Sequence, residues 1–420
     1  MKPSILVSSP DLRPSLTSIL EGLDEASLLQ EVVTTVAIDP EIFWGKFING
    51  ISAVFPSSWR KGIDRRIVPN FLRGKVRTLY WREVFRLLAG RIGNDVFAHR
   101  VWLWADLAFD RQVARKYSGR YQCIYGMEHS SLETFKIQKN LGGLCILRQV
   151  MAHGRTVINL MRGEIDKFQQ YTNLHSRVFK EDMERALARK EAEYQLADLI
   201  VANSNFVKES FVQAGVDPGK VVAIPTGCPP CSDILANSGR GNTPLVFLFV
   251  GTLPLRKGLP YLIKAWRLLN PGRIAELWLV GPRELPEILS HDQSNGIHYF
   301  GSVSKSSLSR IYQQADVLVL PTLLEGLAHV VLEALSHGMP IITTKESGGG
   351  DFVQNDRNGF VIPSADPEAL CGAMAWCLEN RVQLKGMGKA SAEQAQTWTV
   401  ENSNRAHLAA IQKFFQQNNL

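Results

Sequence analysis

No apolar run in the 420-residue sequence approaches the roughly 20 residues that a membrane-spanning helix needs. The first ten residues, MKPSILVSSP, also lack the long apolar segment of a secretory signal. No internal repeat of fixed period is evident, which argues against a solenoid or a propeller. These absences predict a globular protein located in the cytoplasm.

A metal-ligand pattern is also missing. The six cysteines do not form the two close pairs, or the pair plus histidines, that a zinc site requires. One C-x-x-C, from Cys228 to Cys231, leaves a redox or metal role open, although scattered cytosolic thiols are the simpler interpretation. No Asp-x-Asp metal motif stands out, so we expect neither a metal nor a bound cofactor.

The first predicted strand, residues 5–8, is not followed by a glycine-rich loop. It leads into SSPDLRPS, which contains no glycine, so no phosphate cradle can be placed there.

Length and composition describe an ordinary soluble globular protein of about two domains, with 45% apolar and 21% charged residues. The net charge of +7 is concentrated in residues 60–120, where fifteen Lys or Arg face five Asp or Glu. Such a region favours an anionic partner, either a membrane surface, a lipid-linked phosphate or, less readily, a nucleic acid. Aromatic residues among these charges suit a membrane-facing surface, but a cationic surface over an aromatic core explains them equally well: Trp59, Phe71, Trp81, Phe85, Trp102 and Trp104.

The first half alternates strands and helices, which predicts a parallel sheet. Strands are expected at 122–125, 144–147 and 220–224, with a long charged helix over 166–196. Glu128, His129 and His153 follow predicted strand ends, where ligands bind in such sheets. We expect Glu128 and His129 on the acceptor side of a site, although a lone histidine is more often structural.

The second half has the same rhythm over residues 245–378 and is separated from the first by a Gly-, Pro-, Ser- and Asn-rich linker. Its central stretch, residues 321–350, predicts a strand end, a loop with Glu325, a helix with Glu333, a second strand and three consecutive glycines. A helix N-terminus offers unpaired N–H groups to an anion, and glycine lets the backbone approach a ligand. Each glutamate alone could equally be a helix cap or a solvated acid.

Arg256 and Lys257 follow the buried strand 245–251 and precede Gly258. A guanidinium and an ammonium at this place could neutralise a diphosphate, whereas most loop charges are simply solvated.

These residues together resemble the retaining nucleotide-sugar glycosyltransferases of the GT-B fold, family four in the usual classification. The resemblance is strong from residue 197 to 378 and rests on ADLIVANSNFVKESFVQAGV, VGTLPLRKG, LWLVGP, NGFVIP and the stretch HYFGSVSKSSLSRIYQQADVLVLPTLLEGLAHVVLEALSHGMPII. The E-x7-E pair of Glu325 and Glu333 is its most specific element. Residues 1–196 share only the rhythm of the acceptor half.

The resemblance implies an α/β fold of two Rossmann-like domains facing across a cleft, with a C-terminal helix crossing back to the first domain. We expect an acceptor-side domain of residues 1–226 plus about 402–420, a linker over 227–244, and a donor-binding domain over 245–401.

The implied activity is transfer of a hexose-type sugar from a nucleotide diphosphate, with UDP- or GDP-sugars as expected donors, to a hydroxyl of a glycan or lipid-linked acceptor. Retention of anomeric configuration, a part in polysaccharide biosynthesis and independence of metal are implied as well. Three other functions stay open: a catalytically silent nucleotide-sugar binder, a nucleotide-sugar epimerase of the same fold, and a nucleic-acid binder, for which no recognition motif is present.

The resemblance also implies roles for individual residues. Glu325 would hold hydroxyls of the donor sugar as a catalytic residue, Glu333 the ribose, and Arg256 with Lys257 the diphosphate. His153 would be the histidine beside the reacting carbon. The remaining donor-binding residues would be Thr252, Val303, Gly326, Leu327, Ala328, His329 and Gly349.

Two departures from the family pattern concern these positions. Thr252 stands where an arginine is usual, and Arg256 could replace it. Ala328 stands where a glycine is usual.

Overall fold

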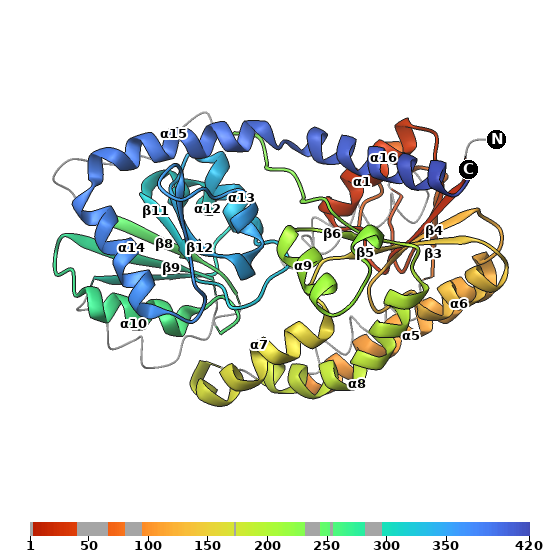
Figure 1. Ribbon diagram of the computed structural model, residues 1–420, viewed down its shortest axis with the longest axis horizontal. Helices are drawn as coiled ribbons and strands as arrows, with labels where there is room; N and C mark the ends of the chain where they lie inside the picture. Colours follow the sequence, from red (N-terminus) through yellow and green to blue (C-terminus); the bar gives the residue numbers. More distant parts are fainter. Residues whose placement is uncertain are drawn as a thin grey trace, which may run out of the picture.

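The computed structural model describes residues 3–39, 66–79, 95–171, 174–231, 244–252, 255–281 and 296–420. Two parallel sheets, each covered by helices, form two Rossmann-like domains that lie side by side (Figure 1). The predicted two-domain α/β fold is therefore confirmed.

The first sheet has the strand order β3-β2-β1-β4-β5-β6-β7. Its strands are β1 Ile5–Ser8, β2 Leu29–Thr34, β3 Val76–Thr78, β4 Cys123–Met127, β5 Leu144–Gln149, β6 Leu199–Ala202 and β7 Val221–Ala223. The helices of this half are α1 Pro14–Glu25, α5 Asp95–Tyr117, α6 Leu132–Asn140, α7 Gly154–Lys167, α8 Leu174–Leu196 and α9 Asn205–Gln213.

The second sheet has the order β10-β9-β8-β11-β12-β13. Its strands are β8 Leu245–Val250, β9 Ala275–Val280, β10 Ile297–Gly301, β11 Val317–Leu320, β12 Ile341–Thr344 and β13 Gly359–Ile362. All six residues of β8 and all four of β11 are buried, as expected for strands covered on both faces. The helices are α10 Leu259–Leu269, α12 Lys305–Gln314, α13 His329–Ser336, α14 Pro367–Glu379 and α15 Arg381–Thr397.

The last helix, α16 Val400–Gln417, returns to the first domain and packs against α1 (Figure 1). Its residues Ile411, Phe414 and Phe415 are buried in the first-domain core. The predicted crossing of the C-terminal helix is confirmed.

The two chain segments that pass between the domains are hydrogen-bonded to each other. The Cys228 N–H donates to the Trp398 carbonyl at 2.8 Å, and the Trp398 indole N–H donates to the Pro225 carbonyl at 3.1 Å. The Ser403 hydroxyl donates to the same Pro225 carbonyl at 2.7 Å. Any rotation of one domain against the other must therefore involve both segments together.

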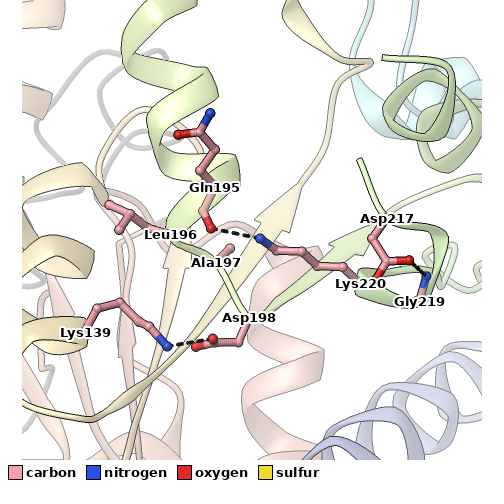
Figure 2. A pocket seen from close by; sticks show the side chains of 8 residues that line it. All are labelled: Lys139, Gln195, Leu196, Ala197, Asp198, Asp217, Gly219 and Lys220. Atoms are coloured by element: carbon pink, nitrogen blue, oxygen red, sulfur yellow. Dashed lines mark hydrogen bonds and ion pairs between the residues drawn. The ribbon is translucent and has the colours of Figure 1, made fainter. Parts of the chain in front are cut away.

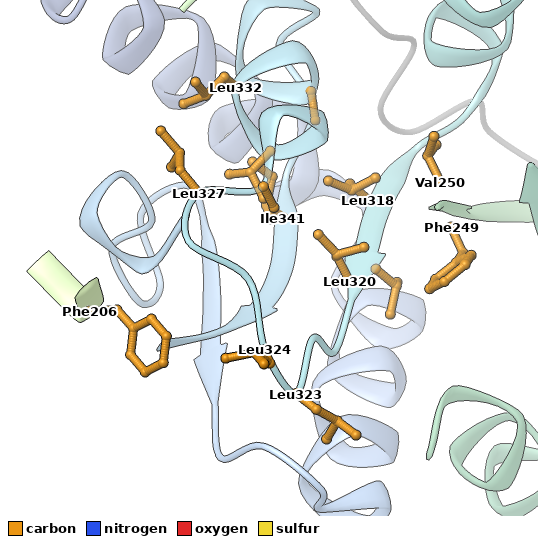
Figure 3. Close-up of a cluster of buried hydrophobic side chains, with 14 of the residues drawn as sticks. Phe206, Phe249, Val250, Leu318, Leu320, Leu323, Leu324, Leu327, Leu332 and Ile341 are labelled. Atoms are coloured by element: carbon orange, nitrogen blue, oxygen red, sulfur yellow. The ribbon is translucent and has the colours of Figure 1, made fainter. Parts of the chain in front are cut away.

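A buried apolar cluster continues from the second domain into the first. Phe206, at the start of α9, belongs to the same cluster as Leu324 and Leu327 of the loop between β11 and α13 (Figure 3). The loop that carries Glu325 is thus anchored on both sides of the domain junction.

Several elements differ from the sequence-based expectation. The helix predicted over 166–196 is α8, which begins at Leu174 and is preceded by a separate helix, α7. Helix α15 was not predicted. Trp59, Trp81 and Phe85 lie outside the described residues, whereas the side chain of Trp104 is exposed on α5. In the described ranges, no helix combines the length and the apolar character of a membrane crossing.

Candidate active site

The predicted donor-binding residues lie at the point where the strand order of the second sheet reverses. Strands β8 and β11 are neighbours. The chain continues from β8 to β9 on one side of this pair and from β11 to β12 on the other side. Ligands of open parallel sheets bind at the carboxyl ends of such strands. Arg256 and Lys257 follow β8, and Glu325 follows β11, so the topology brings them to this place.

Glu325 forms ion pairs with both cations. Its Oε1 lies 3.4 Å from the Arg256 guanidinium and 3.3 Å from the Lys257 ammonium. The three side chains are between 12% and 18% exposed, so the charges are shielded but reachable. Lys257 reaches this position because its stem lies over Gly251, where a Cβ would come within 2.9 Å of its Cδ.

The backbone holds this cluster in place. The N–H of Leu323 donates to the Arg256 carbonyl at 2.8 Å, and the N–H of Glu325 donates to the Glu346 carbonyl at 2.8 Å. The loop after β8, the loop after β11 and the loop after β12 are therefore tied together around one carboxylate.

Glu333 lies one turn into α13, and its position is fixed by a buried tyrosine. The Tyr312 hydroxyl donates to Glu333 Oε2 at 2.9 Å, and the tyrosine is only 1% exposed. Burial and the neighbouring carboxylate raise the pKa of Tyr312, so the hydroxyl keeps its proton and remains a donor.

His329, the first residue of α13, lies among all these charges. Desolvation lowers its pKa most, and Lys257 lowers it further. Glu333 and Glu325 act in the opposite direction. His329 and Glu333 lie one turn apart on α13, which follows the loop that carries Glu325.

The glycine stretch after β12 supports the same loop. It forms two short turns, Lys345–Ser347 and Gly349–Asp351, with Gly348 between them at φ +65°. A Cβ on Gly348 would come within 2.1 Å of the Gly326 carbonyl oxygen, and one on Gly349 within 2.8 Å of Val331. The glycines thus allow close packing of backbone against backbone beside Glu325.

Three contacts join the loops after β11 and β12 to the first domain. The Ser204 hydroxyl donates to the Gly326 carbonyl at 2.6 Å, and the Asn205 N–H donates to Asp351 Oδ2 at 2.8 Å. A Cβ on Gly326 would come within 1.7 Å of the Val150 carbonyl oxygen. The residue next to Glu325 is therefore in direct contact with the acceptor-side domain.

Buried polar atoms without a hydrogen-bond partner gather at the same edges of both sheets. Within the described residues, four of the five such side-chain atoms lie at or just after the carboxyl ends of strands: Ser8 Oγ in β1, Gln149 Oε1 in β5, Asn203 Oδ1 after β6 and Thr322 Oγ1 after β11. The fifth, the Tyr125 OH, belongs to the middle residue of β4. Buried polar groups in proteins are almost always satisfied. Their concentration here marks this edge as a place for a polar ligand.

The first-domain candidates are more deeply placed than the sequence predicted. Glu128 forms an ion pair with Lys190 at 2.6 Å and accepts from the Tyr194 hydroxyl at 3.2 Å. Burial is the largest single effect and raises the pKa of Glu128, but Lys190, His129 and a hydrogen bond with Gln149 together outweigh it and lower that pKa. His129 has φ +72°, and its N–H donates to Glu193 at 2.8 Å. Contact of either residue with an acceptor stays a prediction.

His153 caps α7 and is 3% exposed. Its Nδ1 accepts from the Arg155 N–H at 3.2 Å, and its ring packs against Tyr194 and Phe211. Burial lowers the pKa of His153, so the ring is neutral at pH 7. The place beside the reacting carbon that the resemblance implies for it stays a prediction.

The remaining predicted donor residues lie around the same edge. Thr252 is exposed directly after Gly251, and Val303 is half-buried between β10 and α12. Leu327 and Ala328 are buried under the loop, 4% and 1% exposed, so they can offer a ligand only backbone groups.

A surface cavity of about 360 Å³ lies elsewhere, between the end of α6, the end of α8 and the turn before β7 (Figure 2). It is lined by Lys139, Asp198 and Lys220, which adjoin the amino ends of β6 and β7. Asp198 pairs with Lys139 at 2.7 Å, and Lys220 donates to the Gln195 carbonyl at 2.9 Å (Figure 2). Its charges are thus engaged with each other, on the edge opposite to the candidate site.

The sequence alone did not single out Tyr312, Ser204 or Arg148. Arg148 carried a usable signal, since it interrupts an apolar strand with a charge. Tyr312 and Ser204 carried none, because a tyrosine on an amphipathic helix and a helix-capping serine are ordinary residues.

Comparison with known proteins agrees with this geometry. Residues 244–380 match the family of glycosyl transferases group 1. Sulfoquinovosyl transferase SQD2 of Arabidopsis thaliana is 29% identical over 187 residues, which is 42% of this chain and 36% of that protein. The chain spans only about a third to three fifths of the length of the curated relatives it matches.

Solved structures cover the whole chain. Sucrose-phosphate synthase from Thermosynechococcus elongatus has a TM-score of 0.61 at 18% identity, covering 99% of this chain and 100% of that one. Anabaena HepE, solved with UDP and glucose, has a TM-score of 0.59 at 15% identity, covering 98% and 100%. The chain therefore has the GT-B fold, and residues 244–380 of its second domain are similar to the glycosyl transferases group 1.

Proposed function

We propose that this protein is a retaining glycosyltransferase of family four that moves a hexose-type sugar from a nucleotide diphosphate, UDP or GDP, to a hydroxyl of a glycan or lipid-linked acceptor. The observation that carries the proposal is the cluster of Arg256, Lys257 and Glu325 at the switch point of the second sheet. HepE, a structural neighbour, binds UDP and glucose.

The cluster suits a sugar attached to a diphosphate. The carboxylate of Glu325 can accept hydrogen bonds from sugar hydroxyls, while the two cations attract phosphate oxygens. In the absence of donor, the cations are paired with Glu325 itself. When a diphosphate arrives, its charge would compete for the cations and leave the carboxylate oxygens to the sugar.

The chemical task is to break the bond between the anomeric carbon and the diphosphate oxygen while the acceptor oxygen bonds to that carbon. Negative charge develops on the departing diphosphate oxygen, which takes up the proton that the acceptor hydroxyl gives up. Arg256, Lys257 and the N-terminus of α13 would stabilise this charge without a metal. Glu333 would hold the ribose, oriented by Tyr312.

Contact between the domains would limit hydrolysis of the donor. The loop that bears Glu325 touches the first domain through Gly326, so an occupied site is covered from the acceptor side. The basic residues around 60–120 are proposed to hold the protein at an anionic inner membrane surface when the acceptor is lipid-linked.

The proposal is tested by measuring sugar transfer and donor hydrolysis with purified Glu325→Ala and Lys257→Ala variants. Each should lower turnover by at least about 100-fold, the scale of losing one charge-stabilising contact. Lys305→Ala, an exposed lysine at the start of α12, serves as the matched control. Near-normal turnover in both folded site variants would refute the proposal.

Donor identity follows from a thermal-shift screen of UDP-, GDP- and ADP-sugars. A ligand at 100 times its Kd should add about 2.7 kcal/mol of stability. Binding without any transfer or hydrolysis would instead identify a silent nucleotide-sugar binder, and conversion of the free donor sugar would identify an epimerase.

A further inference from the structure

Arg148 is a buried cation that the proposed reaction does not yet use. It lies near the end of β5 and is 4% exposed. Its Nη1 donates to the Ser15 carbonyl at 3.3 Å, and no Asp or Glu in the described part of the chain pairs with it. A guanidinium has five N–H donors and keeps its proton in proteins, so burial without a counter-charge is costly.

A second unsatisfied group lies beside it. Tyr125 of β4 pairs with Ile146 of β5, two residues before Arg148, so both side chains are on the same face of the sheet. The buried Tyr125 hydroxyl has no hydrogen-bond partner among the described residues. Burial lowers the pKa of Arg148 most, the adjacent Tyr125 hydroxyl raises it, and Arg13, exposed just before α1, lowers it further.

This group of residues faces the donor site. The Val150 carbonyl, two residues after Arg148, is the oxygen that a Cβ on Gly326 would approach within 1.7 Å, so the end of β5 meets the residue next to Glu325. Arg148 belongs to the first domain, whereas Arg256 and Lys257 serve the diphosphate from the second. The Arg148 guanidinium is therefore a further cation, on the acceptor side of the site, that the donor diphosphate does not neutralise.

We propose that Arg148 binds a phosphate group of the acceptor, with the Tyr125 hydroxyl as a further donor, so that the acceptor is a phosphate ester. The guanidinium fork suits a phosphate, which accepts two parallel N–H bonds from it. This proposal rests on the function proposed above and adds the chemical class of the second substrate. It also explains why an unpaired charge is kept in the first-domain core.

The test is a calorimetric titration of inorganic phosphate into the full chain saturated with UDP, which occupies the donor cations. The variants are Arg148→Met, Arg148→Lys and, as a matched control, Arg155→Met, an exposed arginine paired with Glu191. We expect Arg148→Met to weaken phosphate binding at least 10-fold, Arg148→Lys to weaken it less, and the control to leave it within 2-fold. The Kd of UDP should stay within 2-fold in all of them.

Thermal unfolding separates a binding role from a structural one. Without phosphate, Arg148→Met should unfold at the same temperature as the wild type or higher, because the change removes an unpaired buried charge. A clear fall in Tm would show that Arg148 is structural and would overturn the proposal. Unchanged phosphate affinity in Arg148→Met, or a loss of UDP affinity there, would overturn it as well.

Two further arms identify the source of the phosphate. Arg148-dependent binding of glucose 6-phosphate indicates a free sugar phosphate, and Arg148-dependent binding of vesicles that contain phosphatidic acid indicates a lipid-linked one. If the wild type binds no nucleotide diphosphate, the proposed function fails by itself, and phosphate titration without UDP still tests Arg148.

Discussion

Glu333 depends on a single buried hydroxyl for its orientation. Tyr312 donates to it at 2.9 Å from the core side of α12, so the carboxylate is held before any ligand arrives. A preoriented carboxylate loses less freedom on binding than a free one.

We therefore predict that Tyr312→Phe weakens the affinity for UDP by about tenfold, about 1.4 kcal/mol, while the affinity for pyrophosphate is unchanged. Pyrophosphate has no ribose, so only the nucleoside part should respond. Calorimetric titration of both ligands provides the measurement, and Tyr299→Phe, an exposed tyrosine of β10, is the control. An equal loss for both ligands would mean that Tyr312 supports the whole site and not the ribose contact.

His407 gives a prediction for pH. It is 3% exposed on α16, and burial, assisted by Arg148, lowers its pKa to about 3. The unfolded chain binds a proton near pH 6.5, whereas the folded chain does not, so the stability is greatest above pH 6.5 and falls as the pH decreases.

At pH 5 this histidine should cost about 2 kcal/mol of unfolding free energy relative to pH 7. Urea denaturation of the wild type and of His407→Gln at both pH values measures the difference, which the variant should lack. His298→Gln, a half-exposed histidine of β10, should leave the pH dependence as it is. The same pH dependence in His407→Gln would show that other groups cause it.

At the scale of elements, the loop after β11 is fitted to the first domain through Gly326. A Cβ there would come within 1.7 Å of the Val150 carbonyl oxygen, which is backbone and cannot turn away. Gly326 does not have a positive φ, so an alanine would be acceptable to the backbone itself. The only obstacle is the neighbouring domain.

Gly326→Ala should accordingly displace the loop and lower transfer by about 10-fold to 100-fold, as expected for a misplacement near 1 Å. Steady-state kinetics measure the effect. Gly386 is an exposed residue of α15, and a Cβ there would meet no atom within 4 Å. Gly386→Ala should therefore retain activity and raise the free energy of unfolding by up to about 1 kcal/mol. Full activity in Gly326→Ala would mean that the catalytic state does not have this domain contact.

The sequence predicted the elements that surround the site because their signals are local. Apolar β-branched strands such as β12, and the serine cap of α12, are visible in the printed letters. Helix α15 was missed because two glycines and several small residues weaken its apolar stripe. It is helical because it packs along α13, a contact between distant segments.

The residues of the candidate site were likewise predictable only where they belong to a local sequence pattern. Glu325, Glu333 and Lys257 belong to a local pattern, whereas the burial of His153 and the isolation of Arg148 depend on which helices cover β5. Alternating polarity within one strand does not reveal what lies above it. The first domain therefore had to be seen before its charges could be interpreted.

At the scale of the molecule, the first domain is completed by residues that come last in the chain. Ile411 is fully buried against the first-domain core, although α16 follows the entire second domain in sequence. The two domains share the crossing segments near Pro225 and Trp398, but each has its own sheet. Their stabilities can therefore respond separately to a mutation and to a ligand.

Ile411→Ala should destabilise the first domain by about 2–5 kcal/mol, the usual loss for truncating a buried isoleucine. If UDP binds the second domain, it should raise the unfolding temperature of that domain in the variant as in the wild type. Differential scanning calorimetry with and without UDP should resolve two unfolding transitions. The mutation should lower the unfolding temperature of the first domain only. Lys413→Ala, an exposed change on the same helix, should alter neither. A single transition that shifts as a whole with both UDP and Ile411→Ala would show that α16 and the paired crossing segments couple the domains into one folding unit.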